Sequence, residues 1–258
     1  MKLDARDVTV KAADATLVAG ASLSVQAGEF VGLIGPNGAG KSTLLRAIVG
    51  VRPRNAGEVT LDRRPLADIP ARERARNLAF LPQERRVEWR LRVRDVVTLG
   101  RYPHHAGIGG ATEADNRAVD QALVSVDVEH LQAMPASVLS AGEKARVLLA
   151  RALAVEAAVL VADEPIAALD PYHQLHVMEI LHAQARAGKA VLVVLHDLSL
   201  AARFMDRLVL MSKGAIVADG APAVVLSAER LSAVYRINVL RGEHANRPWL
   251  LPWARDEV

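Results

Sequence analysis

Residues 35–42 are Gly-Pro-Asn-Gly-Ala-Gly-Lys-Ser, a string that fits the pattern G-x-x-x-x-G-K-[ST]. The apolar run at 30–34 precedes it and predicts a short buried strand, and residues 43–49 follow with helical spacing up to Gly50. This order points backbone N–H groups and the positive end of a helix dipole at one place. The string alone could be a chance glycine-rich turn, but with these flanks it predicts a nucleoside triphosphate site.

Each residue type in the loop has an expected role. Glycines let the chain curl around phosphate oxygens with no Cβ in the way. Lys41 is expected to reach the β- and γ-phosphates, and the Ser42 hydroxyl is expected to hold Mg²⁺. The expected cradle consists of Gly35, Pro36, Asn37, Gly38, Ala39, Gly40, Lys41 and Ser42.

The remaining segments predict an α/β protein with a parallel sheet. Alternation within residues 3–34 predicts antiparallel strands. Apolar runs predict buried strands, and 3.6-residue spacing predicts helices between them. The expected strands are 57–62, 78–81, 158–162, 190–195, 207–211 and 215–218. The expected helices are 93–100, 114–133, 140–155, 172–187 and 198–205. A small helical tail is expected after Gly220. Buried strands that alternate with helices indicate a parallel sheet covered on both faces.

The length and composition of the chain limit its number of domains and its cellular compartment. At 258 residues the chain can form one large domain or two small ones. The absence of cysteine excludes disulfides and thiolate metal sites and favours a reducing cytoplasm. We find no apolar leader and no run of membrane-span length, so we expect a chain that does not cross a bilayer alone.

Arginines are concentrated in one region. Ten of them lie between Arg63 and Arg94. They could form a nucleic-acid patch, but Phe80 and Trp89 are the only aromatic residues there. A solvated surface is therefore the preferred interpretation.

Polar residues follow three of the predicted buried strands. Asp163 and Glu164 end an apolar strand, where ligands bind in open α/β sheets. Asp163 suits a role in holding Mg²⁺, and Glu164 suits a role in positioning or deprotonating the attacking water. The alternative is a solvated Asp-Glu pair at the start of a loop. His196 and Gln83 occupy similar positions, but each is a weak signal alone.

A second anion-binding helix start is predicted at residues 139–143, Leu-Ser-Ala-Gly-Glu. The alternative is an ordinary helix start, with Ser140 as N-cap and Glu143 completing a capping box. Two such starts could serve one nucleotide within one polypeptide, or two polypeptides could hold the nucleotide between them. Their spacing leaves both arrangements open.

Together these motifs resemble, in order and over nearly the whole chain, the ATP-binding subunit of ABC transporters. The matches are Gly35 to Thr43 (Walker A), Gln83 (Q-loop), Leu139 to Glu143 (signature), Val159 to Glu164 (Walker B), Ala168 to Asp170 (D-loop) and His196 (switch histidine). The resemblance implies a P-loop NTPase core with a parallel sheet, an N-terminal antiparallel β subdomain and a helical subdomain that carries the signature. It also implies one domain over residues 1–258, with the helical subdomain at about 85–155.

The resemblance also implies roles for these residues, with ATP and Mg²⁺ as cofactors. Glu164 would be the general base and His196 the γ-phosphate contact, while Asp170 would couple two sites across a homodimer. Mg²⁺ would be held by Ser42, Gln83 and Asp163, and Gln83 would also signal to membrane subunits. The nucleotide would contact Walker A through Thr43 and, from the other copy, Ser140, Ala141, Gly142 and Glu143.

A finer similarity concerns residues 99–105 and the tail from Gly220 to Tyr235. Both segments are similar to the ATPases of importers for ferric siderophores, haem and cobalamin. This implies two transmembrane permease subunits, a periplasmic substrate-binding protein as an indirect partner, no nucleic acid, and a peripheral position on the cytoplasmic face of the inner membrane. The permease is expected to dock near Gln83 and near Arg85, Arg86 and Arg90.

Other functions stay open alongside this one. They are a soluble ABC-type ATPase acting on nucleic acid or ribosomes, a transporter of another substrate, and a catalytically idle regulatory module. The sequence leaves the identity of the chelate open.

Two departures from the family pattern carry expectations of their own. Ala141 replaces the first glycine of L-S-G-G-Q, which is expected to slow closure without abolishing activity. Ala12 occupies the place of the aromatic residue that stacks on adenine. Because such stacking contributes on the order of 1 kcal/mol, we expect weaker nucleotide affinity and poor discrimination between ATP and GTP.

Overall fold

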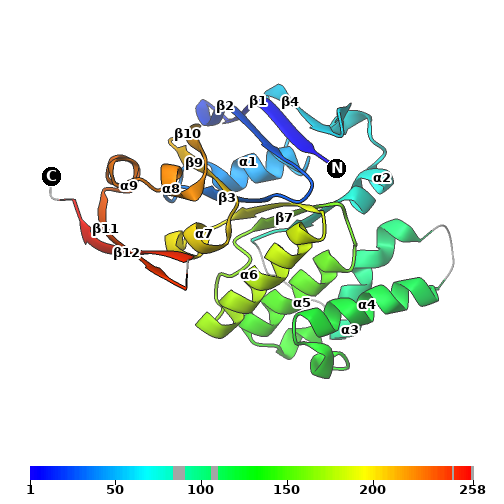
Figure 1. Ribbon diagram of the computed structural model, residues 1–258. Helices are drawn as coiled ribbons and strands as arrows, with labels where there is room; N and C mark the ends of the chain where they lie inside the picture. The colour runs from blue at the N-terminus through cyan, green and yellow to red at the C-terminus, as the bar shows by residue number, and fades with distance from the viewer. Residues whose placement is uncertain (84–90, 106–109, 246, 257–258) are drawn as a thin grey trace.

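A six-stranded sheet forms the centre of the computed structural model, which describes residues 1–83, 91–105, 110–245 and 247–256. The strand order is β10–β9–β3–β8–β7–β6 (Figure 1). The strands are β3 (Phe30–Ile34), β6 (Leu78–Leu81), β7 (Val159–Asp163), β8 (Ala190–Val194), β9 (Arg207–Ser212) and β10 (Ala215–Gly220). All pair in parallel except β10, which is antiparallel to β9. Every residue of β3, β7 and β8 is buried, as expected for strands covered on both faces.

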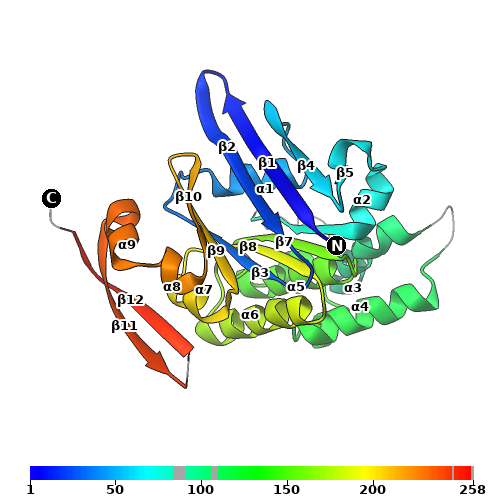
Figure 2. The same ribbon diagram turned by 45° about the horizontal axis from the view of Figure 1, so that its top comes forward.

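A smaller antiparallel sheet covers one face of the large one (Figure 2). Its order is β2–β1–β4–β5, formed by β1 (Leu3–Ala12), β2 (Ala15–Val25), β4 (Ala56–Leu61) and β5 (Arg64–Pro65). Helix α1 (Lys41–Ile48) lies between the two sheets, and its apolar side shares one buried cluster with residues of both. This layer confirms the predicted N-terminal antiparallel strands.

Helices cover the opposite face of the large sheet (Figure 1). They include α3 (Val93–Thr98), α4 (Glu113–Ser125), α5 (Ala141–Leu153), α6 (Pro171–Arg186) and α7 (Leu198–Phe204). Their apolar sides form a second buried cluster with the other face of the strands. Shorter helices connect the elements: η1 (Leu66–Asp68), α2 (Ala71–Asn77), η2 (Leu99–His104), η3 (Glu129–Leu131) and η4 (Ala136–Val138). The mixed α/β fold with a parallel sheet is therefore confirmed.

The predicted helix over 114–133 is wrong at its end. Helix α4 stops at Ser125, and Asp127 adopts a left-handed backbone with φ 55°. This turn lets Val126, Val128 and Leu131 all pack into the core, which a straight helix would not allow. The tertiary contacts of these apolar residues therefore override the helical spacing.

The C-terminal region is only partly the predicted helical tail. Helix α8 (Pro222–Val225) packs against β9 and β10. Helix α9 (Ala228–Tyr235) follows and contacts β11 (Ile237–His244), which forms a hairpin with β12 (Arg247–Arg255) (Figure 1). The hairpin packs on α7 through Leu250, whose carbonyl accepts a hydrogen bond from Ser199. It was not predicted, because Pro248 and Pro252 weaken the strand signal of β12. Within the described residues no helix is long and apolar enough to span a bilayer.

Candidate functional site

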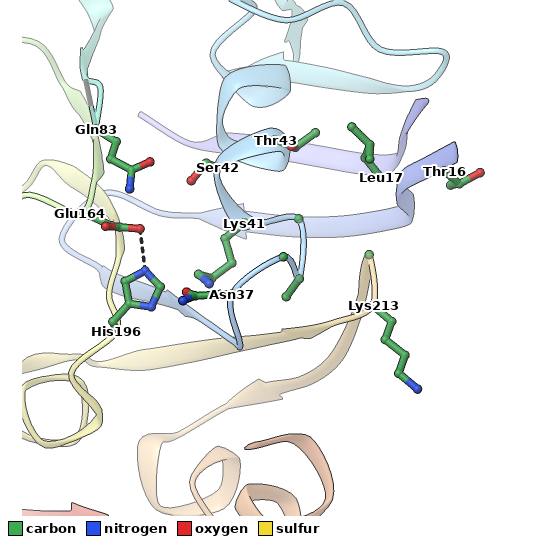
Figure 3. A pocket seen from close by; sticks show the side chains of 14 residues that line it. Thr16, Leu17, Asn37, Lys41, Ser42, Thr43, Gln83, Glu164, His196 and Lys213 are labelled. Carbon is green, nitrogen blue, oxygen red and sulfur yellow. Dashed lines mark hydrogen bonds and ion pairs between the residues drawn. The ribbon is translucent and has the colours of Figure 1, made fainter. Parts of the chain in front are cut away.

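Four neighbouring strands deliver the predicted site residues to one edge of the large sheet. The loop after β3 carries residues 35–40, while Asp163, His196 and Gln83 end or follow β7, β8 and β6. Beside them lies a pocket of about 560 Å³ (Figure 3). Its lining residues are Thr16, Leu17, Asn37, Gly38, Ala39, Gly40, Lys41, Ser42, Thr43, Gln83, Glu164, His196, Lys213 and Gly214. The structure thus brings the glycine-rich loop, Gln83, Glu164 and His196 together.

The glycine-rich loop has the backbone that its sequence requires. Gly40 is the N-cap of α1 with φ 97°, a left-handed conformation that glycine adopts without strain. A Cβ at this position would lie 2.6 Å from the Leu17 carbonyl oxygen, so the loop also packs too closely for a side chain here. The loop therefore leads directly into a helix N-terminus, the arrangement that binds phosphate.

Lys41 is held inside this loop. Its side chain is buried, and its Nζ donates to the carbonyl oxygens of Gly35 at 2.7 Å and Pro36 at 2.9 Å. Burial lowers the Lys41 pKa, while the negative charges of Glu164 and Asp163 oppose that shift. Neutral carbonyls stabilise an ammonium less than anionic oxygens do, so a phosphate group would be the better partner.

Ser42 and Asp163 form the part of the site suited to a cation. The Ser42 hydroxyl donates to Asp163 Oδ1 at 2.9 Å. Asp163 is 1% exposed, and its Oδ2 has no hydrogen-bond partner within the described residues. Burial raises the Asp163 pKa, and nearby Glu164 adds to this rise, while the Ser42 bond opposes it.

A buried carboxylate oxygen without a partner fits a bound Mg²⁺. The described residues contain no cluster of three His, Cys, Asp or Glu side chains that could hold a metal. Mg²⁺ commonly takes only one or two protein ligands together with substrate phosphates and water. Ser42 and Asp163 match that donor set.

Glu164 and His196 are paired across the pocket wall. Glu164 Oε1 lies 2.6 Å from His196 Nε2, as the dashed line in Figure 3 marks. The histidine side chain is 43% exposed and the glutamate side chain 15%. Glu164 has a positive φ of 53°, a backbone that non-glycine residues adopt mainly where surrounding structure imposes it. The sequence predicted both residues at this edge but not the pair that they form.

Gln83 completes this side of the pocket. It is exposed and follows β6, and Figure 3 shows its amide pointing toward Ser42 and Glu164. The three arginines expected at a permease contact, Arg85, Arg86 and Arg90, lie outside the described residues.

The predicted residues Ser140 to Glu143 lie elsewhere. Ser140 caps α5: its hydroxyl accepts from the Glu143 N–H at 3.3 Å, and its own N–H donates to the Glu143 carboxylate at 2.8 Å. The capping-box interpretation is therefore confirmed. None of the four residues is among those that line the described pocket. Gly142 faces the loop between β7 and α6 instead, since a Cβ there would lie 3.6 Å from Leu169 Cδ2.

Asp170 is also absent from the described pocket lining. It caps α6 by accepting the His173 N–H at 3.0 Å, and it pairs with His173 Nδ1 at 2.7 Å. These two bonds lower the Asp170 pKa. The chain thus holds two separate groups of predicted residues: one around the pocket, and one where α5 meets the loop before α6.

Sequence reasoning missed the far end of the pocket. Thr16 and Leu17 lie near the start of β2, and Lys213 and Gly214 form the turn between β9 and β10. Gly214 donates to the Ala39 carbonyl at 3.1 Å, so this turn is tied to the glycine-rich loop. No motif marks these residues. Ala12 is exposed and is not among the lining residues, and the described lining contains no Phe, Tyr or Trp.

Comparison with known protein families and curated proteins shows which proteins this chain is similar to. The family model described as ABC transporter matches residues 18–167. A protein of Pseudomonas putida named hemin import ATP-binding protein HmuV is 44% identical over 230 residues, covering 87% of this chain and 89% of that protein. A protein of the same name from Streptomyces coelicolor is 46% identical over 216 residues, covering 84% and 76%.

Solved structures agree with these matches. A dimeric ATP-binding cassette bound to ADP and Pi has a TM-score of 0.76 at 27% identity, covering 85% of this chain and 98% of that one. A structure described as a metal-chelate type ABC transporter has a TM-score of 0.82 over 97% of both chains, and at 22% identity it supports the fold alone.

Proposed function

The chain belongs to the ABC transporter family, and from this premise we propose that it is the ATPase subunit of an importer for haem. Its function as an ATPase of an importer follows from the family and from relatives that are named for import. Relatives of 40–46% identity that are named for hemin import support haem among the possible metal chelates. The site supplies the chemistry, but the substrate pocket would lie on the permease and the binding protein.

The observation that carries the ATPase chemistry is the buried Ser42–Asp163 pair beside Lys41 and Glu164. Lys41 would exchange the carbonyls of Gly35 and Pro36 for phosphate oxygens. Ser42 and Asp163, with Gln83 on the same side, would hold Mg²⁺. Bound there, Mg²⁺ would neutralise charge that develops on the phosphate oxygens.

Glu164 would act as the general base toward the attacking water. Its contact with His196 keeps the carboxylate at the pocket wall, and the exposed imidazole would reach the γ-phosphate once that contact opens. The two residues follow the neighbouring strands β7 and β8, so both lie at the same edge of the sheet.

We further propose that two copies complete each site. Ser140 to Glu143 and Asp170 line no part of the described pocket, and in the proposed dimer they would act on a nucleotide held by a partner copy. The dimeric cassette with ADP and Pi is a precedent for pairing in a similar fold. Helices α3 to α5 would then move as the helical subdomain, about residues 85–155.

The proposed partners are two permease subunits and, through them, a periplasmic substrate-binding protein. The proposed location is therefore the cytoplasmic face of the inner membrane. Gln83 and the arginines that follow it are the proposed contact with the permease.

The test is ATP-driven haem uptake by the reconstituted complex. The chain would be copurified with its permease subunits, and haem accumulation in vesicles would be measured with and without ATP and Mg²⁺. Replacing Glu164 by Gln is expected to lower hydrolysis and uptake at least about 100-fold, because a general base contributes that much. Salt-sensitive binding to DNA or RNA without a copurifying permease would favour the soluble ATPase instead.

A further inference from the structure

The hairpin of β11 and β12 carries apolar side chains on both of its faces. The inner face packs on α7 and the core through buried Leu250 and through partly buried Ile237 and Val239. Directly opposite residues of an antiparallel pair share a face, and successive residues alternate between faces. Leu240 and Leu251, which lie opposite each other, therefore belong to the outer face. An antiparallel sheet with one covered face is normally polar on the other, so this outer face is unusual.

Two tryptophans flank this leucine pair. Trp249 lies opposite Gly242, and a Cβ on that glycine would collide with the indole, so the ring lies over the backbone of β11. Trp253 is the extra residue of a bulge in β12, since its two neighbours pair with consecutive residues of β11. The outer hairpin face thus consists of Leu240, Trp249, Leu251 and Trp253, which are between 40% and 69% exposed. Exposed apolar patches of this kind mark interaction sites.

The hairpin lies away from the proposed permease contact. That contact is near Gln83, which follows the edge strand β6, whereas the hairpin lies on α7 near α8, which contacts β9 and β10 at the other edge of the sheet (Figure 1, Figure 2). The Ser199 hydroxyl, in the first turn of α7, donates to the Leu250 carbonyl. Because α7 begins two residues after His196, the hairpin is attached to the helix that leads out of the pocket.

The spacing of the outer residues on β12 is symmetric about Leu251. Trp249 precedes it by two residues and Trp253 follows it by two. If two copies face each other across a two-fold axis at Leu251, their β12 strands run antiparallel. Leu251 then meets Leu251, and Trp249 of each copy meets Trp253 of the other. A two-fold interface needs this kind of self-complementary surface.

A membrane surface fits the same face less well. Membrane-binding surfaces combine aromatic and apolar side chains with clusters of basic residues. Arg241 lies opposite buried Leu250, and Arg255 lies opposite Ile237, so both arginines belong to the inner face. Among the arginines of the two strands, Arg247 is the one left on the outer face. The charge distribution thus favours a second copy over an anionic lipid surface.

We propose that the outer hairpin face joins two copies of this chain and holds them together in the absence of nucleotide. Packing the two faces removes the exposed indoles and leucines of both hairpins from water, which is favourable. A dimer held here raises the local concentration of one pocket near the signature residues of the other copy. The inference goes beyond the proposed function, because this contact requires no nucleotide.

Single cysteines test the contact, because the chain has none of its own. Leu251→Cys should form a disulfide-linked dimer under mild oxidation without nucleotide. Trp249→Cys mixed with Trp253→Cys should give mixed dimers faster than either variant crosslinks to itself. Val124→Cys is the control, because that position on α4 is 54% exposed and lies outside the hairpin, and it should stay uncrosslinked.

Sedimentation velocity without nucleotide measures the strength of the contact. The wild-type chain should show a monomer–dimer equilibrium that depends on concentration. Trp253→Glu should weaken it about 100-fold, since a buried interface tryptophan contributes about tenfold or more and a two-fold interface contains it twice. Val124→Glu should associate as wild type does, and circular dichroism should show that both variants fold. An equal mixture of Leu251→Glu and Leu251→Lys should dimerise where each alone does not.

A wild-type chain that stays monomeric up to about 1 mM, where even weak interfaces associate, would overturn the inference. So would crosslinking of Leu251→Cys that is no faster than that of Val124→Cys. Monomers that bind anionic vesicles through Trp253, without dimer formation, would assign this face to the membrane instead. Nucleotide is absent from these assays, so their failure leaves the proposed ATPase function untouched. A chain that dimerises here but does not hydrolyse ATP with its permease would refute that function and leave the contact standing.

Discussion

At the scale of one residue, Asp163 is a side chain that suits cation binding and does not stabilise the fold. One of its oxygens accepts from Ser42 and the other has no partner in the described chain. Burial raises its pKa, so the charged form is less favourable in the folded chain than in the unfolded one. Groups of this kind are typical of functional sites.

Replacing Asp163 by Asn should therefore stabilise the isolated chain and remove its activity. The raised pKa means that the folded state binds more protons than the unfolded state. The contribution of Asp163 to the free energy of unfolding therefore declines as the pH rises from the ordinary pKa of 3.8 through the raised pKa of the folded state. At neutral pH the variant should gain about 1 kcal/mol, or about 2–4 °C in melting temperature. Magnesium-dependent hydrolysis should fall by at least about 100-fold.

Thermal unfolding at several pH values and an ATPase assay check this prediction. Asp68→Asn, at an exposed position, serves as control and should change neither quantity. A variant that loses stability at neutral pH would contradict the argument.

The end of the pocket lined by Thr16, Leu17, Lys213 and Gly214 leads to a second prediction at this scale. The described lining of the pocket has no Phe, Tyr or Trp. At this end it includes Thr16 and Leu17. Ala12→Tyr should restore a stacking surface and strengthen ATP binding about fivefold, the effect of about 1 kcal/mol. The preference for ATP over GTP should rise with it.

Equilibrium titration with ATP and GTP measures both effects. Val124→Tyr is the control, because Val124 is exposed on α4 and lies outside the described pocket lining. A wild-type chain that already prefers ATP strongly would show that another residue supplies the base contact.

At the scale of elements, Arg101 joins three segments of the helical layer. It donates from η2 to Asp115 Oδ1 on α4 at 2.9 Å, and to the Ala154 carbonyl and Glu156 Oε2 after α5, both at 2.7 Å. Arg101 and Asp115 are almost fully buried. The Thr112 hydroxyl, and after it Arg101, hold the Asp115 pKa well below its usual range. This network gives the motif at residues 99–105 a structural role.

Arg101→Ala should lower the free energy of unfolding by about 3–5 kcal/mol, because it leaves a buried carboxylate without its guanidinium partner. Arg117→Ala is the matched control: its pair with Glu113 is exposed on the same α4, and its loss should cost at most about 0.5 kcal/mol. Urea unfolding followed by circular dichroism measures both. Equal effects would show that the buried network adds nothing to the fold.

At the scale of the whole molecule, the predicted residues fall into two groups. Lys41, Ser42 and Glu164 line the pocket, whereas Ser140 and Asp170 cap helices outside its described lining. In a symmetric dimer, the helix-capping group of each copy can lie against the pocket group of the other copy, which gives two equivalent composite sites. The arrangement therefore predicts complementation between two inactive variants.

Lys41→Ala and Ser140→Arg should each be inactive alone. Mixed in equal amounts, half of the dimers carry one intact composite site, so about a quarter of wild-type hydrolysis should return if the sites act independently. Steady-state ATPase assays of the separate and mixed variants measure this. No recovery, with mixed dimers shown to form, would mean that each copy uses its own signature residues.

Much of the fold was predictable because its signals are local. The apolar runs of β3, β7 and β8, the glycines of the loop and the capping box at Ser140 each depend on neighbours in sequence. The end of α4 and the C-terminal hairpin were not predicted. Both depend on apolar residues finding distant partners: Val128 in the helical core, and Leu250 against α7.

What the sequence determined by itself was the order of the core strands and helices and the polar residues that follow those strands, since helix period, strand alternation and turn chemistry all act over a few residues. Only the tertiary structure decided which ends meet. The strand order differs from the chain order, so Ser42 contacts Asp163, His196 pairs with Glu164, and the pocket acquires Leu17 and Lys213. Such contacts arise when buried strands choose their neighbours, and no local pattern encodes that choice.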